Sequence, residues 1–372
     1  MGKKESSAKI NGSKFEAAVG RWCLRILFVI VPLVILDIAS PWFITTRAPI
    51  EQKFALGNTR KPEPYTMFKG ERNSKILPEE SLNELGYRGS APSATKGINE
   101  YRIIILGGST IFVGEPPITT LLQQQFEANG LSNIRIYNFG VVSSVSSQEL
   151  ARILFEIVDL KPDLIAMYNG ANDIWQNHLY DPRPGYPFNF IAYELNPLLE
   201  SDVRSYPAIT LFFYGSNLVR NHFRGLLRRQ FLNLDEIRKS VNYGSEQWQD
   251  KIAEIYVNNL IKADKISAAF NAEFVAFFQP VVFYKDVGTE KEENMKKAGP
   301  EFTEHMLEMR TKVLAKIQAS GIDIPRKFVD LSDIYDQTPE EVFTDFIHTR
   351  QDAKILVAEA IYEHIIKTFN PK

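Results

Sequence analysis

From Tyr101 onward the chain alternates short apolar runs with longer amphipathic stretches, and this alternation limits the possible folds more than any other feature. The apolar runs have the length and the β-branched and aromatic content of buried strands. Strands are predicted at 101–106, 134–140, 163–170, 273–280 and 327–335. Helices are predicted at 119–130, 146–162, 245–270, 301–321 and 351–369. This order predicts an α/β fold, a doubly wound parallel sheet of about five strands with helices on both faces.

Length and charge exclude several function classes. The chain has 372 residues, 44% of them hydrophobic, and a formal net charge of −2 at pH 7. This length and hydrophobic content are enough for one large domain with an ample core. No basic stripe is present, so nucleic acid is not an expected partner. Cys23 is the only cysteine, which excludes an intrachain disulfide and a cysteine-based metal site. No cofactor or metal is expected, and the oligomeric state is not indicated.

An apolar run near the amino end follows a cluster of basic residues, which are Lys3, Lys4, Lys9, Lys14, Arg21 and Arg25. The run covers residues 22–39, close to the roughly 17 residues of a short membrane-spanning helix. We predict a basic cytoplasmic tail (1–21) and an uncleaved signal anchor (22–39), with the rest of the chain outside the cytoplasm of a bacterial cell. A cleaved signal peptide is the second interpretation, although Pro41 makes a poor processing site. A buried core helix is the third.

Two segments interrupt the alternating pattern. Residues 40–100 are rich in proline, glycine and charge, which predicts a linker and edge segment. Residues 175–247 follow the third predicted strand and are predicted to form a cap-like insertion in the domain of residues 101–372. Its arginines could meet anionic lipid or glycan, or form a solvated helical face packed on the core. They are Arg220, Arg224, Arg228 and Arg229.

Candidate functional residues follow the predicted strands or precede the last helix. In a doubly wound sheet, ligands bind at the carboxyl ends of the strands. Acyl transfer requires a nucleophile, a base, a carboxylate that orients the base, and donors for the oxyanion. The residues that could supply these parts are Ser109, Gly140, Asn172, Asp345 and His348. Each also has an ordinary structural explanation, as a helix cap, a turn residue or a satisfied polar side chain. Their order and their positions in the topology favour catalysis.

From Tyr101 to the carboxyl end, these segments resemble the GDSL, or SGNH, family of serine hydrolases, whose sheet is of the flavodoxin-like type. The first block, usually GDS, reads GGS here, with Gly108 in place of the aspartate and Ser109 kept. This variant resembles membrane-anchored bacterial members that act on surface glycans. NFG, ending at Gly140, matches the second block; GAND and DFIH match the third and fourth. The segments LNELGYRG and FQPVVFYK also resemble features of bacterial members.

The resemblance implies a role for each matched residue. Ser109 would attack the substrate, His348 would act as the base, and Asp345 would orient His348. The N–H groups of Ser109 and Gly140 and the side-chain amide of Asn172 would form the oxyanion hole. Three function classes remain open. They are an ester hydrolase that removes acyl or acetyl groups from a cell-envelope glycan or lipid, an O-acyltransferase that uses the same triad, and a non-catalytic membrane-anchored scaffold.

The other polar candidates are expected to be structural. Asp173, next to Asn172, is predicted to anchor its loop. The other histidines show no paired metal-ligand spacing, and no catalytic role is predicted for them. These are His178, His222, His305 and His364.

Overall fold

The structure is a computed structural model that describes residues 19–22, 24–39, 59–188, 190–191, 216–222 and 234–371. The chain divides into two compact units, Met1–Ala48 with Ile191–Leu234, and Pro49–Phe190 with Asp235–Lys372. Most of the predicted basic tail and much of the predicted insertion lie outside the described residues. So do Cys23, Arg224, Arg228 and Arg229, and for Arg220 the side chain is not described.

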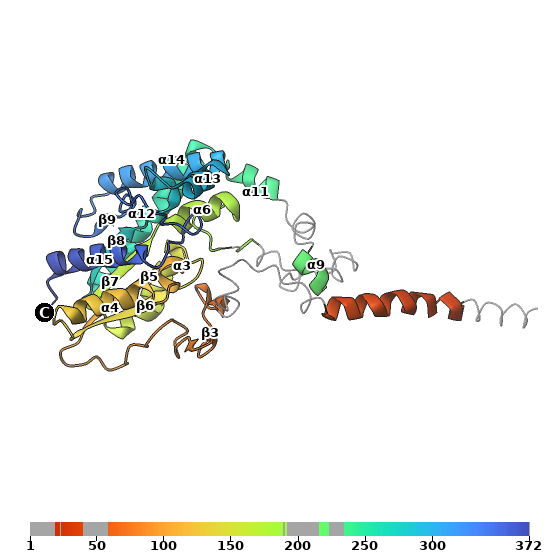
Figure 1. The fold of residues 1–372 in the computed structure, drawn as a ribbon, viewed down its shortest axis with the longest axis horizontal. Helices are drawn as coiled ribbons and strands as arrows, with labels where there is room; N and C mark the ends of the chain where they lie inside the picture. Colours follow the sequence, from red (N-terminus) through yellow and green to blue (C-terminus); the bar gives the residue numbers. More distant parts are fainter. Residues whose placement is uncertain are drawn as a thin grey trace, which may run out of the picture. The chain divides into compact units, whose positions relative to one another are not determined.

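The second unit is built on a five-stranded parallel sheet with the strand order β6-β5-β7-β8-β9 (Figure 1). Its strands are β5 (Tyr101–Gly107), β6 (Ile134–Gly140), β7 (Leu164–Asn169), β8 (Glu273–Phe278) and β9 (Phe328–Asp330). In chain order this is 2-1-3-4-5, the flavodoxin-like arrangement, which confirms the predicted fold class. The fifth strand is shorter than predicted because the Asp330 side chain accepts from the Ser332 N–H (2.9 Å) and turns the chain there.

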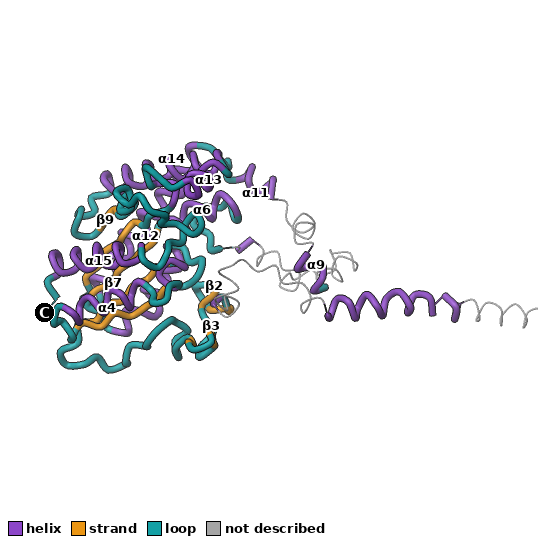
Figure 2. Tube along the Cα trace, in the orientation of Figure 1, coloured by secondary structure: helices purple, strands orange, loops and turns teal. Residues whose placement is uncertain are grey.

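Two groups of helices cover the faces of the sheet (Figure 2). On one side α4 (Ile118–Ala128) packs against α15 (Ala353–Phe369), and on the other α12 (Glu246–Ala269) packs against α5 (Ser146–Arg152) and α14 (Pro300–Ala319). The predicted helix 146–162 continues after α5 as a π-helix (Ile153–Ile157) and a 3-10 turn (Val158–Leu160). Further helices are α3 (Ser109–Phe112), α6 (Ala171–Leu179), α13 (Glu290–Lys297) and the 3-10 turn Val282–Tyr284, and α11 (Leu234–Ser240) begins at the last residue of the first unit.

The central strands end level with one another, and this positions the site. Gly107 at the end of β5 pairs with Gly140 of β6 and with Tyr168 of β7, and Asn169 pairs with Phe278 of β8. These strands are almost entirely buried, as their apolar runs predict. The residues that follow them therefore emerge at a single edge of the sheet.

The segment before β5 forms two small antiparallel sheets that the sequence did not predict. One consists of β1 (Lys61–Glu63) and β2 (Met67–Lys69), the other of β3 (Lys75–Leu77) and β4 (Glu80–Ser81). The segment is fixed to the main domain by side chains: the Tyr87 ring stacks on Phe139 at 4.0 Å and its hydroxyl donates to Glu156 (2.7 Å). It is therefore ordered against the domain.

The first unit contains a helix at Val19–Ala39, which is long and apolar enough to cross a membrane by length and composition. Asp37, near its end, accepts hydrogen bonds from the Ser216 hydroxyl and from the N–H groups of Asn217 (3.1 Å) and Leu218 (2.7 Å). Asp37 thereby caps the short helix α9 (Asn217–His222).

Candidate active site

Ser109 is the first residue of α3, directly after the double glycine at the end of β5. Glycine is required at these two positions because a side chain would not fit, and not because the backbone has a positive φ. A Cβ on Gly107 would lie 2.5 Å from the Tyr168 carbonyl oxygen, and one on Gly108 would lie 2.3 Å from Asn172 Nδ2. Gly108 itself has φ −86°. The turn therefore places a buried serine beside the Asn172 amide at the edge of the sheet.

Ser109, His348 and Asp345 form a continuous chain of hydrogen bonds. His348 Nε2 lies 2.8 Å from Ser109 Oγ, and His348 Nδ1 lies 2.8 Å from Asp345 Oδ2. The serine and the histidine are 239 positions apart in the sequence, so the fold alone brings them together. The arrangement has the geometry of a nucleophile, a base and an orienting carboxylate.

The backbone fixes Asp345 and His348 relative to each other. The Thr344 N–H donates to the His348 carbonyl oxygen (2.8 Å), which closes a tight loop around the pair. The final helix begins only at Ala353, whose N–H donates to the Asp352 side chain (3.1 Å). Asp345 therefore does not cap that helix, contrary to the structural alternative considered from the sequence.

The surroundings of Asp345 favour its ionised form. Burial alone would raise the pKa of Asp345. Hydrogen bonds from the His348 ring and from the N–H groups of His348 (2.7 Å) and Ile347 (2.9 Å) outweigh that effect and hold the pKa below its usual value. An ionised carboxylate at Nδ1 favours the tautomer with its proton there, so that Nε2 presents a lone pair to the serine hydroxyl.

Asn172 lies in the first turn of α6, the helix that follows β7, and is buried beside Gly108. Its Nδ2 donates to the Ser144 carbonyl oxygen (2.7 Å), and its Oδ1 accepts from the Trp175 indole N–H (2.7 Å). Gly170, before it, has φ +104° and lies where a Cβ would meet the Phe278 ring at 2.5 Å. The GAND segment therefore requires a glycine at the turn. The hydrogen bond from Trp175 identifies the Asn172 atom that it contacts as the amide oxygen, which sets the orientation of the amide group.

The structure does not support the predicted role of Gly140. The Gly140 N–H donates to Asn138 Oδ1 (2.9 Å), so it already has an acceptor. A Cβ on Gly140 would lie 2.9 Å from both the Phe112 nitrogen and Ile111 Cγ2. This glycine therefore allows β6 to approach α3, and it is a packing residue.

Ser143, which the sequence analysis did not single out, lies in a turn beside the site. It has φ +67°, an uncommon conformation for a residue with a side chain. The carbonyl oxygen of the next residue, Ser144, lies 3.7 Å from the Cβ position of Gly108, so this turn borders the nucleophile turn. Within the described part of the chain, the N–H groups of Ser109 and Ser143 have no acceptor. A serine carries no sequence signal of a left-handed backbone, unlike a glycine.

A buried polar network supports the Ser143–Ser144 turn. Arg152 Nη2 donates to Ser144 Oγ (2.7 Å), and the Ser146 N–H donates to Asp173 (3.0 Å). Burial raises the pKa of Asp173 to about 6 and that of Glu149 to about 8. These contacts agree with the anchoring role expected for Asp173.

The other histidines have structural surroundings. His305 is buried, stacks on His178 with ring centroids 4.6 Å apart, and bonds through Nε2 to the Ile174 carbonyl oxygen (3.3 Å). His364 Nε2 bonds to the Arg326 carbonyl oxygen (3.2 Å), and the His222 side chain lies outside the described residues. Among the residues that the structure describes, no group of three or more His, Cys, Asp or Glu side chains is arranged to hold a metal ion.

No protein-family model matches the sequence, and no curated protein matches it. Several solved structures are similar at low identity. An acetyl xylan esterase, AlAXEase, is 12% identical with a TM-score of 0.40, covering 71% of this chain and 100% of that one. A GDSL-like lipase from Bacteroides thetaiotaomicron is 13% identical (TM-score 0.37; 73% and 92% covered). An acetylxylan esterase from Geobacillus stearothermophilus is 12% identical (TM-score 0.39; 73% and 96% covered). Because these identities and TM-scores are low, the functional assignment rests on the geometry of the site.

Proposed function

We propose that the chain is a membrane-anchored serine esterase of the SGNH type, which cleaves an ester through an acyl-enzyme intermediate. The observation that carries this proposal is the hydrogen-bonded chain from Asp345 through His348 to Ser109, at the edge of the sheet where ligands bind in doubly wound folds. Unrelated hydrolases use the same constellation, so its geometry supports the chemistry independently of sequence similarity.

The roles follow from the positions of the atoms. Ser109 Oγ attacks the ester carbonyl carbon while His348 Nε2 takes the hydroxyl proton, and Asp345 stabilises the imidazolium that forms. The proton then passes to the oxygen of the leaving alcohol as the C–O bond breaks. Water repeats the sequence on the acyl-enzyme and releases the acid. A sugar hydroxyl in place of water would give acyl transfer by the same steps.

The oxyanion requires donors that are in place before the reaction. We assign Asn172 Nδ2 and the N–H groups of Ser109 and Ser143 to this role. The Asn172 amide lies against Gly108, and neither N–H has an acceptor among the described residues. Gly140 is left out because its N–H donates to Asn138.

The proposed substrate is an acyl or acetyl ester on a cell-envelope glycan or lipid. The helix Val19–Ala39 supports this proposal because an anchor would hold the catalytic unit near the envelope. Basic residues before the helix favour a cytoplasmic amino end and an extracytoplasmic catalytic unit. A reporter fused after Lys372 should be reachable only from outside the cytoplasm of a bacterial host, and cytoplasmic labelling would contradict this orientation.

A panel of esters tests the function. The full-length protein in detergent is given short- and long-chain acyl esters and acetylated sugars, with and without an added sugar acceptor. Hydrolysis that Ser109→Ala abolishes supports the proposal. Product formation only with the acceptor would indicate an acyltransferase, and equal turnover by the Ser109→Ala protein would overturn the assignment.

A further inference from the structure

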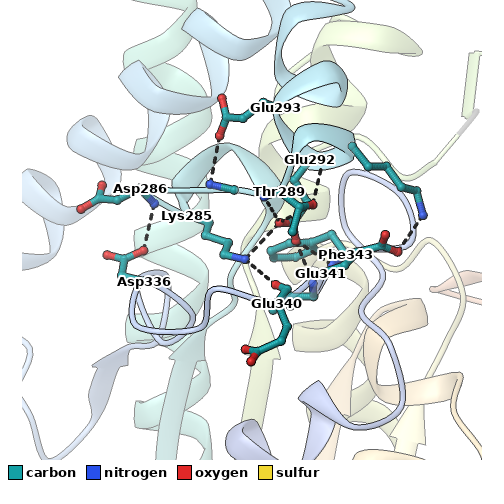
Figure 3. A network of polar contacts seen from close by, with 12 residues as sticks. Lys285, Asp286, Thr289, Glu292, Glu293, Asp336, Glu340, Glu341 and Phe343 are labelled. Atoms are coloured by element: carbon teal, nitrogen blue, oxygen red, sulfur yellow. Dashed lines mark hydrogen bonds and ion pairs between the residues drawn. The ribbon is translucent and has the colours of Figure 1, made fainter.

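A buried ion pair contacts the backbone of residues 340–343, which precede Asp345 and His348 in the chain (Figure 3). Lys285 ends the FQPVVFYK segment after β8, and Glu292 lies in the first turn of α13. The Lys285 Nζ to Glu292 Oε2 distance is 3.0 Å, and the two side chains are 1% and 0% exposed. An isolated buried pair of this kind rarely stabilises a fold enough to offset its desolvation. The other contacts of Lys285 and Glu292 indicate the role of this ion pair.

The Lys285 ammonium and the second carboxylate oxygen of Glu292 form hydrogen bonds with the backbone segment that precedes Asp345. Glu292 Oε1 accepts from the N–H groups of Val342 (2.8 Å) and Phe343 (3.0 Å), and Lys285 Nζ donates to the Glu340 carbonyl oxygen (2.9 Å). Figure 3 shows both side chains directed at this segment. The ion pair therefore holds the backbone at three positions between Glu340 and Phe343, within a few residues of Asp345.

The same loop is closed on itself and held at its tip. Phe343 pairs with Thr349 in an antiparallel bridge, and the Arg350 N–H donates to the Val342 carbonyl oxygen (2.7 Å). The Val282 N–H donates to the Phe346 carbonyl oxygen (3.0 Å). Because the base of the loop is fixed by Glu292, a shift of the carboxylate would move the whole loop.

Glu292 is held as a carboxylate. Burial alone would raise the pKa of Glu292, but the N–H groups of Thr289, Val342 and Phe343 and the Lys285 ammonium lower it to about 2. Thr289 also forms a capping box with Glu292, which fixes the carboxylate at the start of α13.

We propose that Glu292, oriented by Lys285, is a positioning residue for the reaction: its carboxylate anchors the Val342 and Phe343 N–H groups, so that Asp345 and His348 meet Ser109. This inference rests on the proposed esterase function. Neither residue touches the reacting atoms, and their effect passes through the backbone of the loop.

Two double variants separate this role from general stability. Lys285→Met with Glu292→Gln removes both charges but keeps an amide oxygen as the acceptor for Val342 and Phe343. Lys285→Met with Glu292→Leu removes the charges and the acceptor, and apolar replacement of a buried pair is often neutral for stability. The Leu variant should lose about 10- to 100-fold in kcat with little change in KM, as expected for a misplaced base, whereas the Gln variant should keep most of its turnover.

A matched control uses the exposed ion pair on the same helix and loop. Lys291 and Glu341 pair at 2.8 Å with side chains that are 53% and 31% exposed. Lys291→Met with Glu341→Gln should leave kcat unchanged. Equal kcat in the Gln and Leu variants, or an equal loss in the control, would overturn the positioning role.

A second readout does not depend on turnover. The His348 Nδ1 proton, held by Asp345, should give a low-field proton resonance that His348→Ala removes. Its position should be unchanged in the Gln variant and the control, and should shift in the Leu variant, where His348 Nε2 loses its contact with the Ser109 hydroxyl. An unchanged resonance in a folded Leu variant would overturn the proposal. If the wild type shows the resonance but cleaves no ester, the proposed function fails while this comparison still tests the positioning.

If the Leu variant does not fold, Glu292→Asp alone provides the test. It keeps a counter-charge for Lys285, but its shorter side chain draws the carboxylate back from the Val342 and Phe343 N–H groups, so hydrogen exchange across residues 340–350 should be faster than in the wild type and kcat should fall. Faster exchange with wild-type kcat would overturn the proposal.

Discussion

The Trp175 indole N–H donates to Asn172 Oδ1 across 2.7 Å, one turn further along α6. Because the oxygen of the amide accepts this bond, Nδ2 is turned toward Ser144 and Gly108. The Trp175 ring also packs edge-on against Phe346, with centroids 5.4 Å apart. Trp175 thus links the proposed oxyanion donor to the loop that carries the base.

Trp175→Phe should lower kcat by about 3- to 10-fold, the value of one hydrogen bond, because it keeps the ring but removes the N–H. The apparent KM should change little. In an Asn172→Ala background the same substitution should have no further effect. Trp248→Phe is the matched control, because its indole N–H donates to the Pro182 carbonyl oxygen (2.6 Å), and it should affect stability rather than turnover. Additive losses in the double variant would show that Trp175 does not act through Asn172.

Asn172→Ala should lose about 100- to 1,000-fold in kcat on a good ester, because one oxyanion donor is removed. Asn172→Asp should be worse, since it places negative charge beside the developing oxyanion. Steady-state kinetics of folded variants provide the measurement. Near wild-type turnover in both would make Asn172 a turn residue only.

Ser143→Gly should keep near wild-type turnover, because the proposed donor is the backbone N–H and glycine adopts φ +67° without strain. Thermal unfolding should show equal or higher stability, since a strained non-glycine residue costs of order 1–3 kcal/mol. A large loss of kcat in a stable Ser143→Gly protein would instead assign the role to the hydroxyl.

His305 should make the protein less stable in mild acid. Burial and the nearby His178 lower the pKa of His305 to about 4, below the roughly 6.5 of an unfolded histidine. Between these pH values the unfolded chain binds a proton that the folded chain does not, so stability is present above pH 6.5 and is lost as the pH falls toward 4. The contribution is up to about 3 kcal/mol.

His305→Gln keeps a donor for the Ile174 carbonyl oxygen and does not titrate. Urea unfolding at pH 7 and pH 4.5 should show a smaller acid loss in the variant than in the wild type. Because Asp173 and Glu149 titrate in both proteins, the difference between the two proteins reports His305 together with its coupling to His178. Identical pH profiles would contradict the assignment.

The sheet and the place of the candidate site residues could be predicted from the sequence for a physical reason. Fully buried strands must be apolar runs, and the polar residues between those runs and the helices must lie at strand ends. Ser109, Asp345 and His348 were found in this way, and the structure brings them into hydrogen-bond contact. Asn172 follows the same logic at the end of β7.

The remaining features depend on tertiary contacts that no local pattern encodes. Ser143 was missed because the sequence pattern does not mark a serine with a positive φ, and Gly140 was selected as a glycine although it allows β6 to approach α3. The short strands before β5 are only two or three residues long, which is too short for a periodic signal. Glu292 contacts a backbone 50 positions away, so its role is visible only in the fold.

The most direct test of the proposed chemistry is covalent labelling of the nucleophile. The full-length protein in detergent is treated with a fluorophosphonate and digested, and the modified peptide is identified by mass spectrometry. We predict a single adduct at Ser109, absent in Ser109→Ala and formed far more slowly in His348→Ala, because the imidazole activates the hydroxyl. An unlabelled wild type, or a Ser109→Ala protein labelled at the wild-type rate, would contradict the proposed function.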